Sequence, residues 1–115
     1  MNILHKLDAL TDDFCNTSEH KAFLKAKNAL QKDQTAFDQT LLFERIYYDI
    51  CENESNSLRR SQLIEKLYQQ NISVLSNQTA MQYLLAKKGF LSLKNCSMAY
   101  LKQRINDSLG ILDIE

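Results

Sequence analysis

Apolar residues recur at helical spacing along most of the chain, and short polar stretches interrupt them. Near the start, Ile3, Leu7, Leu10 and Phe14 follow one another at intervals of four, three and four residues. These intervals place the four side chains on one face of an α-helix. The pattern therefore predicts an amphipathic helix over residues 2–15.

The polar stretch after this helix predicts the start of a second one. Asn16 to Ser18 are residue types preferred at helix N-caps, and Glu19 follows Asn16 at the spacing of a reciprocal capping pair. A second helix is expected over residues 18–32, with Phe23 and Leu30 on its apolar face.

A third helical region is expected after Asp33. The short carboxylate of this residue is suited to accept amide hydrogens of the next turn, and its charge suits the positive end of a helix dipole. Residues 52–57, ENESNS, contain no apolar side chain and predict a loop or a loosened joint. Ser57 is then expected to cap a helix over residues 58–70.

The strongest periodic signal lies in residues 78–109. Leu84, Leu91, Met98 and Ile105 repeat every seven residues, and the repeat runs across Gly89. Because the apolar phase continues through the glycine, one unbroken helix is expected, at a cost of about 1 kcal/mol for that residue.

Together these elements predict an all-α fold. Residues 34–70 and 78–109 are expected to form the arms of a long antiparallel helical hairpin, with the two short N-terminal helices packed on it, in a single domain spanning residues 1–115. Gly110 is expected to end the second arm, and the tail is expected to pack back through Ile111 or Leu112.

The length of the second arm predicts self-association. A helix over residues 78–109 would be about 48 Å long, whereas a compact chain of this size has a radius of gyration of about 13 Å. Part of its apolar stripe would stay exposed to water within one chain. The simplest way to cover that stripe is a second copy in a twofold homodimer. The residues expected to pack within the hairpin or across the dimer are Phe37, Leu41, Met81, Leu84, Leu91, Met98 and Ile105.

Charge adds a second interpretation. The chain of 115 residues is 44% hydrophobic and formally neutral, but residues 1–57 are acidic and residues 58–115 are basic. Such halves attract each other, and the neutrality of the whole chain favours an ordinary solvated surface. The alternative is an RNA-binding protein, or a surface for an acidic partner, that uses the basic 58–104 region through Arg59, Arg60, Lys87, Lys88 and Lys94.

No pattern of known catalysis is present, so an enzyme is not expected. Two glycines cannot supply a phosphate-binding loop, and neither GxSxG nor HExxH occurs. Cys15, Cys51 and Cys96 are widely spaced and odd in number, which predicts mostly buried thiols and no catalytic residue, metal ligand or cofactor. No segment reaches the length of a membrane span or resembles a signal peptide, so a cytoplasmic protein that does not bind membranes is expected.

Several residues occur in the same order along the chain as the matching residues of a known protein family. They lie in SEHKAFLKAKNALQKDQTAFDQTLLF and YLKQRINDSLG and around them, and comprise Glu19, Phe23, Ala26, Leu30, Asp33, Phe43, Leu84, Leu101 and Ile105. In this order the chain resembles the YlbF/YmcA family of small helical bacterial proteins over nearly its whole length.

The resemblance implies an all-helical, commonly dimeric protein without catalytic activity. Some members regulate competence, sporulation and biofilm formation through a complex that directs the endoribonuclease RNase Y to particular transcripts. The expected function is a non-enzymatic adaptor whose partners are a second copy, other YlbF/YmcA-type proteins or an RNase complex. Longer members carry a C-terminal extension with cysteines implicated in iron–sulfur binding, and this chain has no cysteine after Cys96.

Overall fold

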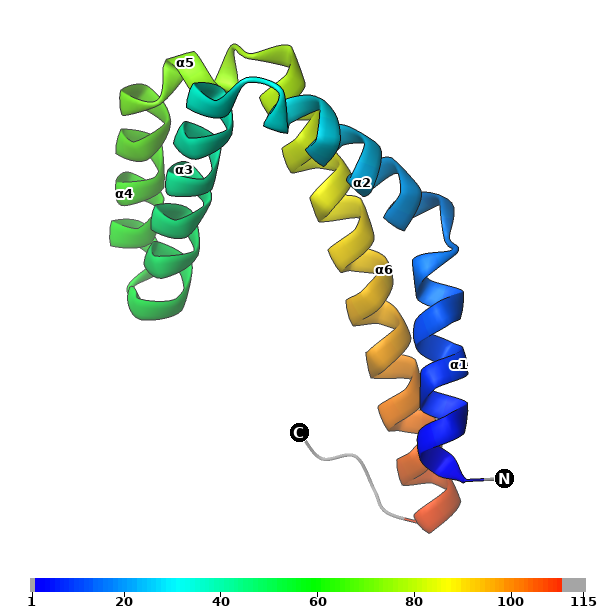
Figure 1. Ribbon diagram of the computed structural model, residues 1–115. Coiled ribbons are helices and arrows are strands. Elements are labelled where there is room, and N and C mark those ends of the chain that lie inside the picture. The colour runs from blue at the N-terminus through cyan, green and yellow to red at the C-terminus, as the bar shows by residue number, and fades with distance from the viewer. Residues whose placement is uncertain (1, 111–115) are drawn as a thin grey trace. The chain divides into compact units, whose positions relative to one another are not determined.

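The computed structural model describes residues 2–110 and is all-α, as the sequence predicts. Its helices are α1 (Ile3–Cys15), α2 (Ser18–Gln31), α3 (Gln34–Asn53), α4 (Ser57–Gln70), α5 (Ile72–Leu75) and α6 (Gln78–Leu109), as Figure 1 shows. No strand occurs among these described residues. The expected contacts of Ile111 and Leu112 lie outside them.

Polar side chains that precede the first three helices cap their N-termini. The Leu4 amide donates to Asn2 Oδ1 at 2.7 Å, and the Ala36 amide donates to Asp33 Oδ1 at 3.1 Å. The N-cap predicted at Asp33 is therefore confirmed. At α2 the His20 amide donates to Thr17 Oγ1 at 3.2 Å, so the capping side chain is Thr17 rather than Asn16.

Asparagines cap the helices of the second half of the chain. The Arg59 amide donates to Asn56 Oδ1 at 3.0 Å, and the Ala80 amide donates to Asn77 Oδ1 at 3.0 Å. Ser57 was expected to cap α4 but is its first helical residue. The reason is that Asn56 is in an extended conformation, with φ −78° and ψ 116°, which brings its side chain to the open amides.

The described residues form two compact units. The first unit contains residues 2–23 and 86–110, and the second unit contains residues 24–85. Helices α2 and α6 each contribute residues to both units. The single domain expected over residues 1–115 stays a prediction.

Within the second unit, α3 and α4 pack against each other as a hairpin of their own (Figure 1). Residues 34–70 are therefore not a single long arm, which corrects the sequence-based expectation. The extended backbone at Glu54 and Asn56 ends α3 and reverses the chain before α4 begins. Arg59 Nε lies 3.4 Å from Glu54 Oε2, so an ion pair spans this reversal.

The second unit also holds all of the buried residues of the described chain. The apolar ones come from five helices, and they are Leu30, Phe43, Leu67, Val74, Ala80 and Tyr83. Thr40 is buried with them and donates its hydroxyl to the Ala36 carbonyl at 2.7 Å, which satisfies that polar group. Burial of these apolar side chains is the main favourable contribution to the folding of this unit.

An aromatic cluster joins α3 to α4. The ring of Phe43 stacks on Tyr47 at 6.5 Å and on Tyr68 at 6.0 Å between ring centroids. Removal of water from the Tyr47 phenol raises its pKa above the usual 10.0, and the neighbouring Cys51 and Tyr68 raise this pKa further. The raised pKa means that the Tyr47 phenol stays neutral to a higher pH than an exposed tyrosine does.

Helix α6 continues through Gly89, as predicted from the apolar repeat. A Cβ at Gly89 would meet nothing within 4 Å, so no close contact requires a glycine there. Gly110 has a φ of 68°, and its amide donates to the Asp107 carbonyl at 3.2 Å. This left-handed residue ends α6 in the way that glycine commonly ends helices.

Replacing Gly89 with alanine should raise the free energy of unfolding by about 1 kcal/mol, because alanine restricts the unfolded chain and suits a helix interior. Urea unfolding followed by far-ultraviolet circular dichroism measures the change. Gly110→Ala is the matched control and should lower stability, since its positive φ is unfavourable for alanine. Destabilisation by Gly89→Ala would show that the residue is needed for a bend in α6.

Candidate interaction surface

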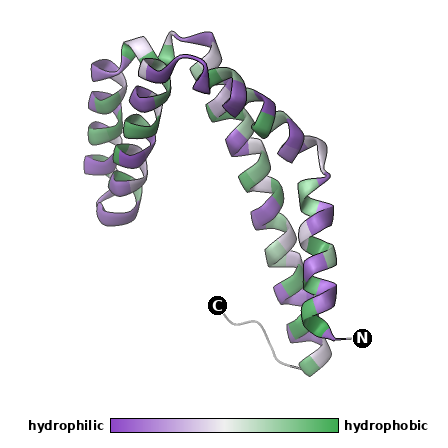
Figure 2. Cartoon of the chain, in the orientation of Figure 1, coloured by the Kyte–Doolittle hydropathy of each residue, from purple (hydrophilic) through white to green (hydrophobic). Residues whose placement is uncertain are grey.

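In the first unit, α1 lies alongside the C-terminal part of α6 and runs antiparallel to it (Figure 1). Of the α1 stripe predicted from Ile3, Leu7, Leu10 and Phe14, the last two residues supply one wall of a groove between the two helices. Figure 2 shows hydrophobic residues recurring along both helices. This pairing is what positions the candidate surface.

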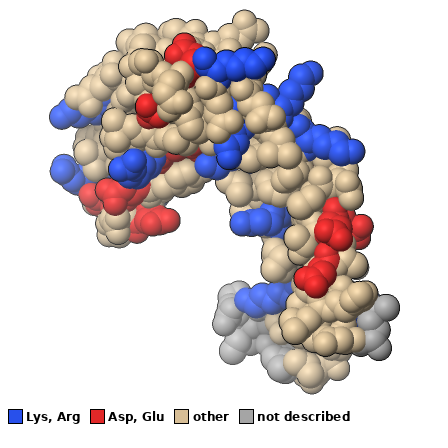
Figure 3. All heavy atoms as spheres, in the orientation of Figure 1, with Lys and Arg blue, Asp and Glu red and all other residues tan. Residues whose placement is uncertain are grey.

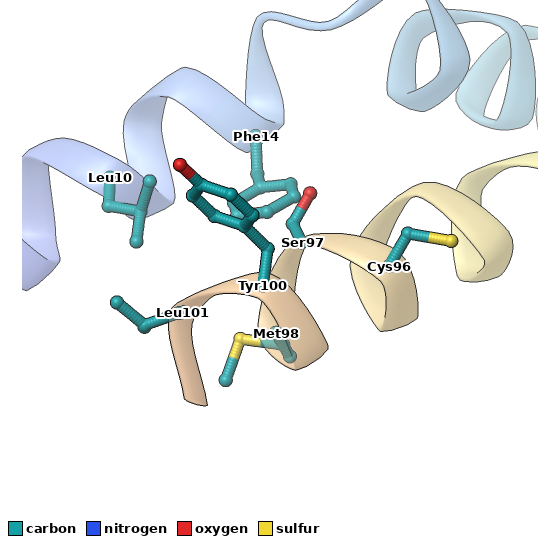
Figure 4. A pocket seen from close by; sticks show the side chains of 7 residues that line it. All are labelled: Leu10, Phe14, Cys96, Ser97, Met98, Tyr100 and Leu101. Carbon is teal, nitrogen blue, oxygen red and sulfur yellow. The ribbon is translucent and has the colours of Figure 1, made fainter. Parts of the chain in front are cut away.

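The groove between α1 and α6 has a volume of about 420 Å³ and is mostly apolar. Its lining consists of Leu10, Phe14, Cys96, Ser97, Met98, Tyr100 and Leu101. In Figure 4, Leu10 and Phe14 from α1 face Tyr100 and Leu101 from α6. Such a lining is typical of a surface that binds apolar side chains and orients them with few polar groups.

An aromatic contact fastens the start of α2 to α6 in the same unit. The rings of His20 and Phe90 meet edge to face at 5.1 Å between centroids, and the rings of Phe23 and Phe90 stack at 6.4 Å. Aromatic pairs of this geometry stabilise packing beyond the area they bury. Two contacts in the first unit therefore hold α6 against the N-terminal helices: the groove residues hold it against α1, and Phe90 holds it against α2.

Despite these contacts, no described residue of the first unit is buried. On α1, Ile3 is 72% exposed and Leu4 is 63% exposed, and on α6 Met98 is 52% exposed and Ile105 is 50% exposed. Two paired helices share a single seam, so the side chains that flank the seam stay in water. The first unit thus presents an apolar surface that its own helices leave open.

The seven predicted packing residues are divided between the two units. Leu91, Met98 and Ile105 lie on α6 in the first unit, where Leu91 is half-buried. The other four belong to the second unit. There Leu41 is exposed, and the other three are half-buried, namely Phe37, Met81 and Leu84. Packing across a dimer stays a prediction for all seven.

The five candidate RNA-contacting residues are divided in the same way. Arg59 and Arg60 lie in the first turn of α4 in the second unit, whereas Lys87, Lys88 and Lys94 lie on α6 in the first unit. Neither unit by itself contains the whole set, and Arg59 pairs with Glu54. Figure 3 shows basic side chains dispersed over several helices. A single basic face for RNA is thus not a property of either unit.

The cysteines differ from the expected buried thiols. Cys15 and Cys96 are exposed and Cys51 is half-buried, and all three are free thiols. Both exposed thiols belong to the first unit, and Cys96 lines the groove. Within residues 2–110, no three His, Cys, Asp or Glu side chains converge as metal ligands would.

No protein-family model, curated protein or solved structure matches the chain. The YlbF/YmcA resemblance is therefore untested and stays a prediction. Across the part of the chain with described structure, none of the helices combines the length and apolarity needed to cross a membrane.

Sequence reasoning missed the contribution of α1 to this surface. The predicted interface contained no residue of α1, although Leu4, Leu7 and Leu10 are all exposed there. The regular apolar spacing of residues 3–14 carries this signal, because it predicts an apolar face on α1. Tyr100, which lines the groove, was also absent from the predicted set.

Proposed function

We propose that this chain is a non-enzymatic helical adaptor that acts by binding proteins, beginning with a second copy of itself. The observation that supports it is the open apolar surface of the first unit, where no residue of α1 or of the 86–109 part of α6 is buried. Transfer of such surface out of water is the main favourable term in protein association. The groove is lined chiefly by aliphatic and aromatic side chains, which suits binding better than acid–base or nucleophilic chemistry.

The resemblance to the YlbF/YmcA family supports a regulatory role in the bacterial cytoplasm. On this proposal the adaptor acts in competence, sporulation or biofilm formation, together with other YlbF/YmcA-type proteins and RNase Y. Affinity purification of the tagged chain from its native cells tests this part. Enrichment of RNase Y or a YlbF/YmcA-type protein, and its loss with a surface variant, is the expected result. If neither RNase Y nor a YlbF/YmcA-type protein is enriched, the proposed pathway is wrong.

The proposed homodimer predicts a mass in solution of about twice the 13.3 kDa of one chain. Sedimentation equilibrium at micromolar concentration measures this mass. Leu91→Asp should produce a monomer or unfold the first unit, because it places a carboxylate on the apolar face of α6. A folded wild-type chain that stays monomeric up to millimolar concentration would contradict the proposed dimer.

A further inference from the structure

Two exposed apolar stripes meet at the groove of the first unit. Ile3, Leu7 and Leu10 form the stripe on α1, and Leu4 lies beside it. Met98, Ile105 and Leu109 form the stripe on α6, where intervals of seven and four residues keep them on one face. Leu10 and Met98 both line the groove, so the two stripes are continuous there.

We propose that the first unit is the dimer interface, with α1 of one copy lying against α6 of the second copy around a twofold axis. This inference rests on the proposed function, because it names the surface and the helix pairing of the same self-binding site. A twofold arrangement makes both contacts at once, since α6 of the first copy then meets α1 of the second. The four helices form one bundle with a shared apolar centre.

The exposed apolar area is close to what a stable dimer needs. The seven apolar residues of the two stripes, Leu4 included, are between 38% and 72% exposed. Full burial of an aliphatic side chain removes about 100 Å² from water, so together they supply roughly 400 Å² per copy. Because about 60% of an interface is apolar, this corresponds to roughly 650 Å² per copy and about 1,300 Å² in total. Specific interfaces of standard size bury about 1,200–2,000 Å².

Charge decides which helices face each other. Helix α1 carries one lysine against three aspartates, a formal balance of −2. The 86–109 part of α6 carries five Lys or Arg residues against one aspartate, a formal balance of +4. Figure 3 shows acidic side chains gathered over α1 and separate basic side chains along this part of α6. Contact between α1 and the partner's α6 therefore joins opposite charges, whereas contact between two α6 helices joins like charges.

The charged residues flank the stripes at helical spacing. Asp8 follows Leu4 by four residues and Asp13 follows Leu10 by three, so each aspartate borders the α1 stripe. Lys94 precedes Met98 by four residues and borders the α6 stripe. No ion pair within residues 2–110 engages Asp8, Asp13 or Lys94. These charges are thus available at the rim of the proposed interface.

A matched pair of surface variants tests the location. Ile105→Asp changes a residue of the α6 stripe that is 50% exposed, and Leu58→Asp changes a residue of the second unit that is 69% exposed. Sedimentation equilibrium should show a dissociation constant raised at least ~100-fold for Ile105→Asp, and changed less than about twofold for Leu58→Asp. Leu4→Asp on α1 provides a second, independent variant and should weaken the dimer similarly. Circular dichroism confirms that each variant retains its helices.

The outcomes separate this inference from the proposed function. If Leu58→Asp dissociates the dimer while Ile105→Asp and Leu4→Asp leave it intact, the interface lies in the second unit and the inference is wrong, although self-binding stands. If the wild type is monomeric up to millimolar concentration, both the self-binding and its interface are wrong. If Ile105→Asp and Leu4→Asp dissociate the dimer and Leu58→Asp does not, the result supports both the self-binding and the proposed interface.

Neutralisation of Lys94 tests the helix pairing. If α1 faces the partner's α6, Lys94→Gln removes attraction at two symmetric positions and should raise the dissociation constant by about two- to tenfold. Asp8→Asn should act in the same direction, and added salt should weaken the wild-type dimer. If two α6 helices face each other instead, Lys94→Gln and added salt should both strengthen the dimer, which would overturn the proposed pairing.

Discussion

Replacement of Leu30 with alanine should lower the free energy of unfolding by about 2–5 kcal/mol. Leu30 is fully buried in the second unit and is one of its two largest fully buried side chains. Alanine removes the apolar contacts of the side chain and leaves a cavity that the surrounding helices fill only partly. Urea unfolding followed by far-ultraviolet circular dichroism gives the change in free energy.

Leu24→Ala is the matched control for this prediction. Leu24 lies on the same helix and in the same unit but is 41% exposed, so its truncation should cost about 1 kcal/mol. The two substitutions delete the same atoms and differ in burial. Equal losses for both variants would mean that the core of the second unit does not contain Leu30.

The helix boundaries were predictable because they depend on neighbouring residues. Asp33 caps α3 through the amide three residues later, and Gly110 ends α6 with its own positive φ. The continuous apolar phase correctly predicted that α6 passes through Gly89. Where the prediction missed by one residue, at Thr17 and Asn56, several suitable capping residues stand together, and backbone conformation chooses among them.

The fold-back of residues 34–70 was not predictable from local pattern. The polar residues 52–57 predict a break, but they do not determine the angle between the helices on either side. That angle depends on contacts between residues distant in sequence, such as Phe43 with Tyr68. Such tertiary contacts also place the predicted packing residues in two separate units.

The exposed face of α1 shows the corresponding limit for the candidate surface. An amphipathic stripe predicts that a face is covered, but it does not say whether the same chain or a second one covers it. In the structure Leu7 of this stripe stays 45% exposed although α1 lies beside α6. Cys15 and Cys96 illustrate the same point, because residue type predicted buried thiols whereas their positions on α1 and α6 leave them exposed.

Replacement of Phe43 with alanine should destabilise the protein by about 3–5 kcal/mol. Phe43 is 6% exposed and its ring stacks on Tyr47 from α3 and on Tyr68 from α4, so it links the two helices of the hairpin. Tyr48→Ala is the comparison variant, because Tyr48 is also aromatic and on α3 and its ring meets Tyr47 edge to face, but it is 41% exposed and its loss should cost much less. Urea unfolding measures both variants.

The same substitution should change the titration of Tyr47. Burial raises the pKa of its phenol above 10.0, and opening of the cluster by Phe43→Ala admits water, so this pKa should fall toward 10.0. The chain has no tryptophan but five tyrosines, so absorbance of tyrosinate measures the shift when the titration of a Tyr47→Phe variant is subtracted. Since a raised folded-state pKa contributes stability that is lost as pH rises above 10.0, the wild type should lose more stability than Phe43→Ala in that range. Equal losses of stability in Phe43→Ala and Tyr48→Ala, with no change at Tyr47, would show that this cluster does not hold α3 against α4.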